Sequence, residues 1–356
     1  MGNGTSSSIA INLDRSNEFY FTNEIISGTV ELTIMEGRIE VEEIFMKLTG
    51  ELSYTSAAAA GRSNKVHSTT QTDYHHIPFF SRKTIFAQPK PGQRFVYGQG
   101  RHSWPFQISL DEHLPPTMNQ PQLYPHVRYY LQVVIDKSWY KPNTKERKIV
   151  AVYPHVNLSD NPQCLQLTTF GNHNRKDLTL KGTLNKSGFV PGESIQIKLE
   201  IANPQRLLIK NIICSIFQIF RIGPIKRESN TIQSLVPNIM NSRAMQFNET
   251  FSIEIPGNIT LAPSYKYQSA SQQAAIVVND YVVRFAVKVE GLFDNFEVNV
   301  PIILGTDQNS GIAAGVPAAA LTMNDDDDDL PPSYDSIVHD PKYQKQEEKT
   351  DEESFF

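Results

Sequence analysis

Two short stretches carry residues whose types and spacing suggest specific chemistry. Near the end of the chain, the run "DDDDDLPPSY" contains Pro331, Pro332 and Tyr334 in the order Pro-Pro-x-Tyr, preceded by Leu330. Consecutive prolines preset polyproline II geometry, so little conformational entropy is lost when they dock in an aromatic-lined groove. The tyrosine ring then fills a second pocket. These four residues predict a ligand for a WW domain, and the alternative is a chance match in a tail that contains prolines.

At the other end, "MGNGTSSS" matches the pattern for N-myristoylation, with Gly2 exposed after removal of Met1 and Ser6 at the favoured hydroxyl position. The alternative is an ordinary flexible terminus. A single myristoyl chain supports only marginal membrane binding, with an association constant on the order of 10⁴ M⁻¹. Gly2 is therefore a candidate acylation site that needs a second contact, from a cargo protein or from a mildly basic surface of the chain.

Other groupings of reactive residues are weak. Neighbouring side chains on a strand point to opposite faces, so we expect His75 and His76 to be exposed loop histidines rather than metal ligands. The basic stretch at 140–148 is expected to be a solvated hairpin, with contact to a phospholipid or a phosphopeptide as the alternative. The chain contains no phosphate-cradling, dinucleotide or nucleophile-elbow motif. We therefore expect no enzyme, no cofactor and no metal.

Charge is divided unequally along the chain. Residues 321–356 contain 8 Asp and 4 Glu against 3 Lys, a balance of -9 within a total of -5, so residues 1–320 carry about +4. The five aspartates at 325–329 predict a solvated spacer that self-repulsion keeps extended, and attraction toward a basic surface is the alternative. Five consecutive carboxylates lack the glycine turn and the ligand spacing of a calcium loop. We expect residues 307–356 to form a disordered acidic tail.

Cysteine usage and hydropathy favour a cytoplasmic location. Cys164 and Cys214 cannot form a disulfide framework, and they lack the CxxC spacing of a zinc site. The longest apolar stretch, at 207–220, is shorter than a membrane span and contains Lys210. The first residues lack the apolar region of a signal peptide.

Hydrophobic residues alternate with polar ones through most of the chain, which predicts strands with one buried face. The clearest case is "EIISGTVELTI" at 24–34, and turn signals such as "VPGE" and "LPPT" separate such runs. With 39% hydrophobic residues the chain can bury a sizeable core. We expect an all-β protein made of antiparallel sandwiches. The other expected strands are 39–54, 104–110, 127–135, 193–201, 207–221, 249–255, 281–289 and 296–304.

The second half of the chain repeats the pattern of the first. "YFTNEIISGTVELTI" at 20–34 aligns with "FVPGESIQIKLEIAN" at 189–203, an offset of 169 residues that matches Glu24 with Glu193. Each half then has an aromatic strand that ends at a proline turn, followed by a long alternating strand, "VRYYLQVVID" or "YVVRFAVKVE". Two copies of one β-domain account for this order, whereas the alternative is the general likeness of any two β-sandwiches.

These stretches, together with "WPFQISLDEHLPPTM", the closing "VPIILG" and the Pro-Pro-x-Tyr tail, resemble the arrestin-like family, in particular its arrestin-domain-containing or α-arrestin branch. The resemblance implies two tandem arrestin-type, immunoglobulin-like sandwiches followed by the acidic tail. The expected organisation is a flexible N-terminus, an N domain, a linker, a C domain and the tail, at residues 1–7, 8–158, 159–175, 176–306 and 307–356.

The resemblance also implies a non-enzymatic trafficking adaptor. Its tail would bind a HECT-type ubiquitin ligase through WW domains, and its body would bind membrane receptors or transporters as cargo, which are then ubiquitinated, endocytosed and sorted. A peripheral membrane contact and recruitment to the plasma membrane and endosomes are expected, and nucleic acid is not an expected partner. The buried charged cluster by which visual and β-arrestins sense phosphate cannot be matched residue by residue, so phosphate-triggered activation is not an expectation.

Two alternatives remain open. The first is a structural subunit of a sorting coat of the retromer type, or a cytoskeletal interaction protein, in which Pro-Pro-x-Tyr is incidental. The second is a β-sandwich enzyme or carbohydrate binder, which a preformed polar pocket with perturbed ionisable groups would favour.

Overall fold

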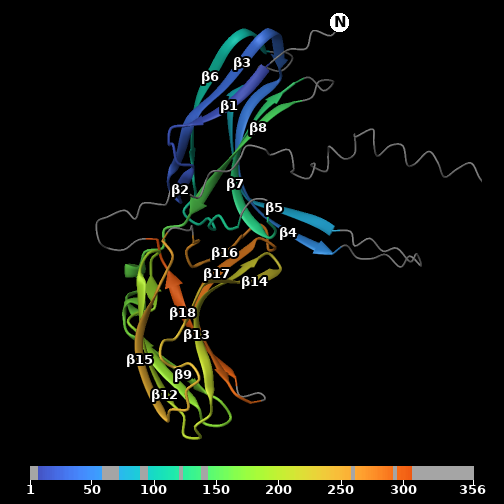
Figure 1. Cartoon of the computed structure of the whole chain (residues 1–356). Helices are drawn as coiled ribbons and strands as arrows, with labels where there is room; N and C mark the ends of the chain where they lie inside the picture. The colour runs from blue at the N-terminus through green and yellow to red at the C-terminus, as the bar shows by residue number, and fades with distance from the viewer. Residues whose placement is uncertain are drawn as a thin grey trace, which may run out of the picture. The chain divides into compact units, whose positions relative to one another are not determined.

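The structure is a computed structural model that describes residues 7–57, 72–88, 95–119, 123–137, 143–257, 261–291 and 295–306. These residues form two β-sandwiches in tandem, as the alternation predicts (Figure 1). The only helices within the described ranges are two short 3-10 turns between the sandwiches, Leu158–Asp160 and Pro162–Leu165. No helix in this part of the chain has the length and apolarity needed to cross a bilayer.

The first sandwich packs a three-stranded sheet, in the order β1-β3-β6, against a five-stranded sheet, in the order β2-β8-β7-β4-β5. Strand β2 pairs with β8 in parallel, and the other pairs are antiparallel. The strands are β1 (Ser7–Leu13), β2 (Phe19–Phe21), β3 (Ile25–Val41), β4 (Glu43–Ala57), β5 (Thr72–Ala87), β6 (Phe95–Ser109), β7 (His126–Asp136) and β8 (Thr144–Tyr153).

The second sandwich packs a four-stranded sheet, in the order β15-β12-β10-β9, against a sheet in the order β11-β18-β17-β13-β14, to which β16 adds by pairing with β17. Here β11 is the strand that pairs in parallel, with β18. The strands are β9 (Thr168–His173), β10 (Thr179–Leu184), β11 (Gly188–Phe189), β12 (Ser194–Ala202), β13 (Ile209–Ile222), β14 (Ile225–Leu235), β15 (Gln246–Glu254), β16 (Tyr265–Gln268), β17 (Ile276–Val289) and β18 (Phe296–Leu304).

The alternation of buried and exposed residues along a strand shows which of its faces packs on the core. Every second residue of β12 is buried and the residues between them are exposed, which is the pattern of a strand with one face on the core. Full burial of each such aliphatic side chain contributes about 1.5 to 3 kcal/mol. The buried residues of this strand are Ile195, Ile197, Leu199 and Ile201.

The duplication seen in the sequence extends to side-chain contacts at the start of each sandwich. The carboxylate of Glu24 accepts a hydrogen bond of 2.8 Å from the backbone N–H of Phe21 and pairs with Arg15 at 2.9 Å. Glu193, 169 residues later, accepts one of 2.9 Å from the N–H of Val190 and pairs with a lysine, Lys186, at 2.8 Å. In both halves the glutamate therefore closes the turn that leads into the first long core strand.

A second equivalence lies at the proline turns. The hydroxyl of Tyr129 donates to the carbonyl of Pro115 at 2.6 Å, and that of Tyr281 donates to the carbonyl of Ala262 at 2.7 Å. Both tyrosines are fully buried and stand on the long alternating strands, β7 and β17. Each hydroxyl thus ties the core strand to the turn that precedes it.

The structure adds strands that the alternation did not reveal. Strands β5, β8 and β14 alternate poorly because much of their surface is exposed. Residues 144–148 of the basic stretch belong to β8, which pairs antiparallel with β7 as the second strand of a hairpin. Strand β9 begins at Thr168, within the range expected to be a linker. Residues 58–71, between β4 and β5, lie outside the described residues.

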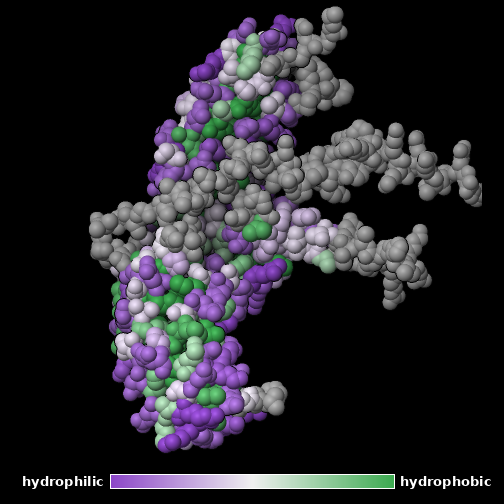
Figure 2. Space-filling model, in the orientation of Figure 1, coloured by the Kyte–Doolittle hydropathy of each residue, from purple (hydrophilic) through white to green (hydrophobic). Residues whose placement is uncertain are grey.

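Apolar packing also joins the two sandwiches. One buried cluster combines residues of the first sandwich, such as Val127 and Leu52, with Phe220, Ile222 and Val277 of the second. Backbone contacts reinforce this junction, since the N–H of Thr306 donates to the carbonyl of Val156 at 2.9 Å. The face of the molecule that Figure 2 shows is mostly hydrophilic, with apolar patches over parts of both sandwiches.

Candidate docking face on the first sandwich

The outer face of the five-stranded sheet contains a buried ion pair. Glu51 on β4 lies directly opposite Arg128 on β7 in the strand register. The guanidinium of Arg128 binds one carboxylate oxygen of Glu51 through Nη2 at 2.7 Å and through Nε at 2.8 Å. Both side chains are only 8% exposed. Because a buried charge is costly to leave unpaired, each member requires the other.

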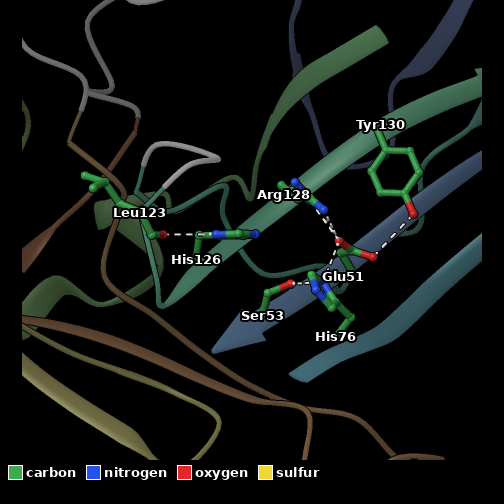
Figure 3. A network of polar contacts seen from close by, with 7 residues as sticks. All are labelled: Glu51, Ser53, His76, Leu123, His126, Arg128 and Tyr130. Carbon is green, nitrogen blue, oxygen red and sulfur yellow. Dashed lines mark hydrogen bonds and ion pairs between the residues drawn. The ribbon is translucent and has the colours of Figure 1, made fainter. Parts of the chain in front are cut away.

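Two further side chains contact the same carboxylate (Figure 3). The hydroxyl of Tyr130 donates to the second oxygen of Glu51 at 3.3 Å, and Nδ1 of His76 on β5 lies 3.5 Å from the first. The hydroxyl of Ser53 lies 2.9 Å from the same Nδ1. Three adjacent strands therefore converge on one carboxylate.

The electrostatics of the cluster keep Glu51 ionised. Burial opposes its ionisation, but the hydrogen bond from His76 and the positive charge and hydrogen bond of Arg128 outweigh that effect. Together they lower the pKa of Glu51 to about 2. The carboxylate is thus a permanent anion at physiological pH.

His126, at the start of β7, is buried beside this cluster. Its Nδ1 lies 3.0 Å from the carbonyl of Leu123, whereas its Nε2 points away from Leu123 and has no hydrogen-bond partner among the described residues (Figure 3). Burial and the charge of Arg128 lower the pKa of His126 to about 4, so the ring is neutral at pH 7. Because His126 is fully buried, this unpartnered nitrogen carries a desolvation cost rather than a free bonding site.

The ion pair neutralises itself and is nearly closed to solvent, so its role is to hold β4 and β7 together. Within the cluster, His76 on β5 is a polar side chain that solvent reaches, at 38% exposure. The described ranges contain no group of His, Cys, Asp and Glu side chains arranged to hold a metal ion. Cys214 is buried in the second sandwich, where burial raises the pKa of its thiol to about 12, so it is a core residue rather than a nucleophile.

The sequence-derived binding residues fall outside this face. Leu330, Pro331, Pro332 and Tyr334 of the tail motif, and Gly2, all lie outside the described residues. Neither the WW-domain ligand nor the acylation site is therefore placed by the structure.

The expectation of loop histidines is wrong. His75 and His76 lie on β5, where Nε2 of His75 is 2.7 Å from the hydroxyl of Ser56 and His76 approaches Glu51. Strand β5 was missed because its alternation is weak. The carboxylate companion was missed because Glu51 is 25 positions away in sequence, and only pairing of β4 with β5 brings it close.

One signal for the ion pair was present in the sequence. Glu51 and Arg128 are each a single charge within a strand of otherwise mostly apolar or small residues, "LTGELSY" and "HVRYYLQVVI". Charges at such positions are rarely buried unless paired. Opposite charges in two strands expected to share a sheet predict a cross-strand pair.

Two tandem immunoglobulin-like sandwiches, each with one short parallel strand (β2 and β11) at the edge of its larger sheet, define the class of this protein. Residues 9–159 match the model of the arrestin (or S-antigen) N-terminal domain, and residues 174–309 match that of the arrestin C-terminal domain. Because the two matches together cover most of the chain, the protein belongs to the arrestin family. Proteins of this family are non-catalytic adaptors.

Two curated relatives show the same relationship at low identity. The chain is 24% identical over 196 residues to arrestin domain-containing protein 17 of Caenorhabditis elegans, which covers 52% of this chain and 45% of that protein. It is 22% identical over 205 residues to arrestin domain-containing protein C of Dictyostelium discoideum, covering 54% of this chain and 29% of that protein. The alignments thus span less than half the length of either relative.

Proposed function

We propose that this protein is an α-arrestin-type trafficking adaptor that links membrane cargo to a WW-domain ubiquitin ligase of the HECT type. The observation that carries the proposal is the sequence "LPPSY" at 330–334, which follows two arrestin domains. Polyproline geometry and a tyrosine anchor are the features that WW grooves select. The body supplies a docking face for cargo, and the tail supplies the ligase.

The adaptor works by proximity. Joining two weak contacts in one chain raises the effective concentration of ligase at the cargo without any catalytic group. In this proposal the protein acts in the cytoplasm, at the plasma membrane and at endosomes. An acyl chain on Gly2 would add to the membrane contact of the protein. The intact mass of the protein from native cells tests this acylation, and a mass without the acyl increment would reject it.

A pull-down with an isolated tandem WW module tests the tail. We expect the wild-type chain to bind and Tyr334→Ala to lose at least about tenfold in affinity, because the ring anchor is removed. Tyr343→Ala is the matched control, since Tyr343 lies in the same tail outside the motif. Equal binding by Tyr334→Ala and wild type would remove the role assigned to the tail.

The same pair of variants separates the adaptor from a coat subunit. In cells, Tyr334→Ala is expected to slow cargo ubiquitination and turnover while Tyr343→Ala leaves both unchanged. Unchanged turnover in Tyr334→Ala, with the protein held in a stoichiometric coat complex, would favour the sorting-coat alternative instead.

A further inference from the structure

A row of cations crosses the outer face of the five-stranded sheet, next to the ion pair described above. Lys47 on β4 lies directly opposite Gln132 on β7 and Lys83 on β5, and Gln132 lies directly opposite Arg147 on β8. Residues opposed in register point to the same face, so these side chains form one line across four strands. We call Arg147, Gln132, Lys47 and Lys83 the basic row.

The basic row carries more positive charge than the fold neutralises. Lys83 pairs with Glu43 at 2.7 Å, but among the described residues neither Lys47 nor Arg147 has a carboxylate partner. The guanidinium of Arg147 instead lies over the ring of Tyr130 at 4.4 Å. Two like charges directly opposite each other, as in Lys47 and Lys83, destabilise a sheet unless an anion lies between them.

An apolar row adjoins the basic row. Ile85 on β5 is 47% exposed and lies directly opposite Phe45, which lies opposite Val134 on β7. Lys145 on β8 completes this line, since it lies opposite Val134. Cations beside an exposed aliphatic side chain are the composition of surfaces that bind the headgroup region of anionic membranes.

The balance of charge on this part of the face supports an anionic ligand. The cations are Lys47, Lys83, Lys145 and Arg147, four in all, and the carboxylates next to them are Glu43 and Asp136, which lie opposite each other. Four cations against two carboxylates leave a local balance of +2. The excess lies at Lys47 on β4 and at Lys145 and Arg147 on β8, the two strands that flank β7.

The first described strand, β1, starts at this end of the sandwich. Ser7, the first described residue, pairs with Ile34 of β3, which belongs to the same small apolar cluster as Ile44 of β4 and Ile135 of β7. The chain neighbours of these two residues, Phe45 and Val134, form the apolar row on the outer face. Four residues lie between Gly2 and Ser7, so five Cα-to-Cα steps separate the two and span at most about 18 Å. An acyl chain on Gly2 would then be within reach of a bilayer that contacts the basic row.

We propose that the basic row and the adjoining Ile85 form a docking surface for the phosphate headgroups of an anionic membrane. The cations bind the headgroups, and Ile85 enters the interface. This inference goes beyond the adaptor function, because it concerns lipid rather than cargo or ligase. It supplies the second membrane contact that a single acyl chain requires.

Vesicle binding by the full-length, unacylated chain tests the surface. Vesicles of phosphatidylcholine alone are compared with vesicles that also contain one fifth phosphatidylserine. We expect binding to the anionic vesicles only, and we expect Lys47→Gln with Arg147→Gln to weaken it about thirtyfold, because each cation near an anionic surface contributes about 1 kcal/mol. Ile85→Ser should weaken binding without changing its dependence on salt.

A matched control uses two lysines on another sheet. Lys181 and Lys198, on β10 and β12 of the second sandwich, are exposed, and Lys181→Gln with Lys198→Gln removes the same charge. Binding that falls equally in both double variants would show a general charge effect and overturn the proposal. A row variant that binds anionic vesicles like the wild type would also overturn the proposal. This holds even if that variant loses affinity for a phosphopeptide, because the surface would then recognise peptide rather than lipid.

The WW pull-down on the same preparations separates this inference from the proposed function. Row variants are expected to bind the WW module like the wild type, and Tyr334→Ala is expected to bind vesicles like the wild type. Melting temperatures within about two degrees of wild type, measured on each variant, confirm that a loss of vesicle binding is not a loss of folding.

Discussion

Glu51 and Arg128 form the most buried ion pair among the described residues, and they illustrate how much one residue depends on its partner. Taking two charges out of water is expensive, and their attraction offsets this cost only when the geometry and the remaining hydrogen bonds are good. Tyr130 and His76 complete the coordination of the carboxylate. Removing one partner should therefore be far worse than removing both.

We predict that Arg128→Met lowers the free energy of unfolding by about 3 kcal/mol or more, because it leaves the ionised Glu51 buried without its cation. Arg128→Met combined with Glu51→Leu should lie within about 1 kcal/mol of the wild type. Urea unfolding curves measure all three proteins. Arg243→Met is the control, because Arg243 pairs with Glu290 at 3.0 Å on the exposed surface, and its loss should cost less than about 1 kcal/mol.

At the scale of elements, close approach of strands sets which residues are tolerated. Strand β1 lies against Gly28 of β3 so closely that a Cβ atom there would lie 2.2 Å from the backbone oxygen of Asn12 and 3.0 Å from the Cα atom of Leu13. Gly98 on β6 has no atom within 4 Å of the same position. Close packing therefore requires a glycine at position 28, whereas the space around position 98 would admit a larger side chain.

We predict that Gly28→Ala lowers the free energy of unfolding by about 1 to 3 kcal/mol, because backbone atoms of β1 must move to admit the methyl group. Gly98→Ala should change it by less than about 0.5 kcal/mol. Thermal unfolding of the two variants measures the difference. Similar losses in both would mean that strand propensity, rather than the approach of β1, decides the cost.

At the scale of the whole molecule, the two sandwiches are copies whose details differ. The carbonyl of Pro115 accepts from Tyr129 and from no other described residue, whereas the carbonyl of Ala262 accepts both from Tyr281 and from Nδ2 of Asn279, at 2.9 Å. A buried carbonyl that loses its only donor costs more than one that keeps a second.

We predict that Tyr129→Phe destabilises the protein by about 1 to 3 kcal/mol and Tyr281→Phe by about 1 kcal/mol or less. Differential scanning calorimetry of both variants measures the costs in the two sandwiches. A larger cost for Tyr281→Phe would contradict the role assigned to Asn279.

The sequence by itself determined the class of fold, the duplication and the tail motif. Alternation is a local property, since successive side chains of a strand point to opposite faces, and the offset between Glu24 and Glu193 needs no knowledge of contacts. Only the tertiary structure decided which strands are neighbours. Glu51 meets Arg128 across 77 positions, and Lys47 joins Arg147 in one row across 100, because antiparallel register places them on the same face. Register depends on pairing between distant segments, which no local pattern specifies.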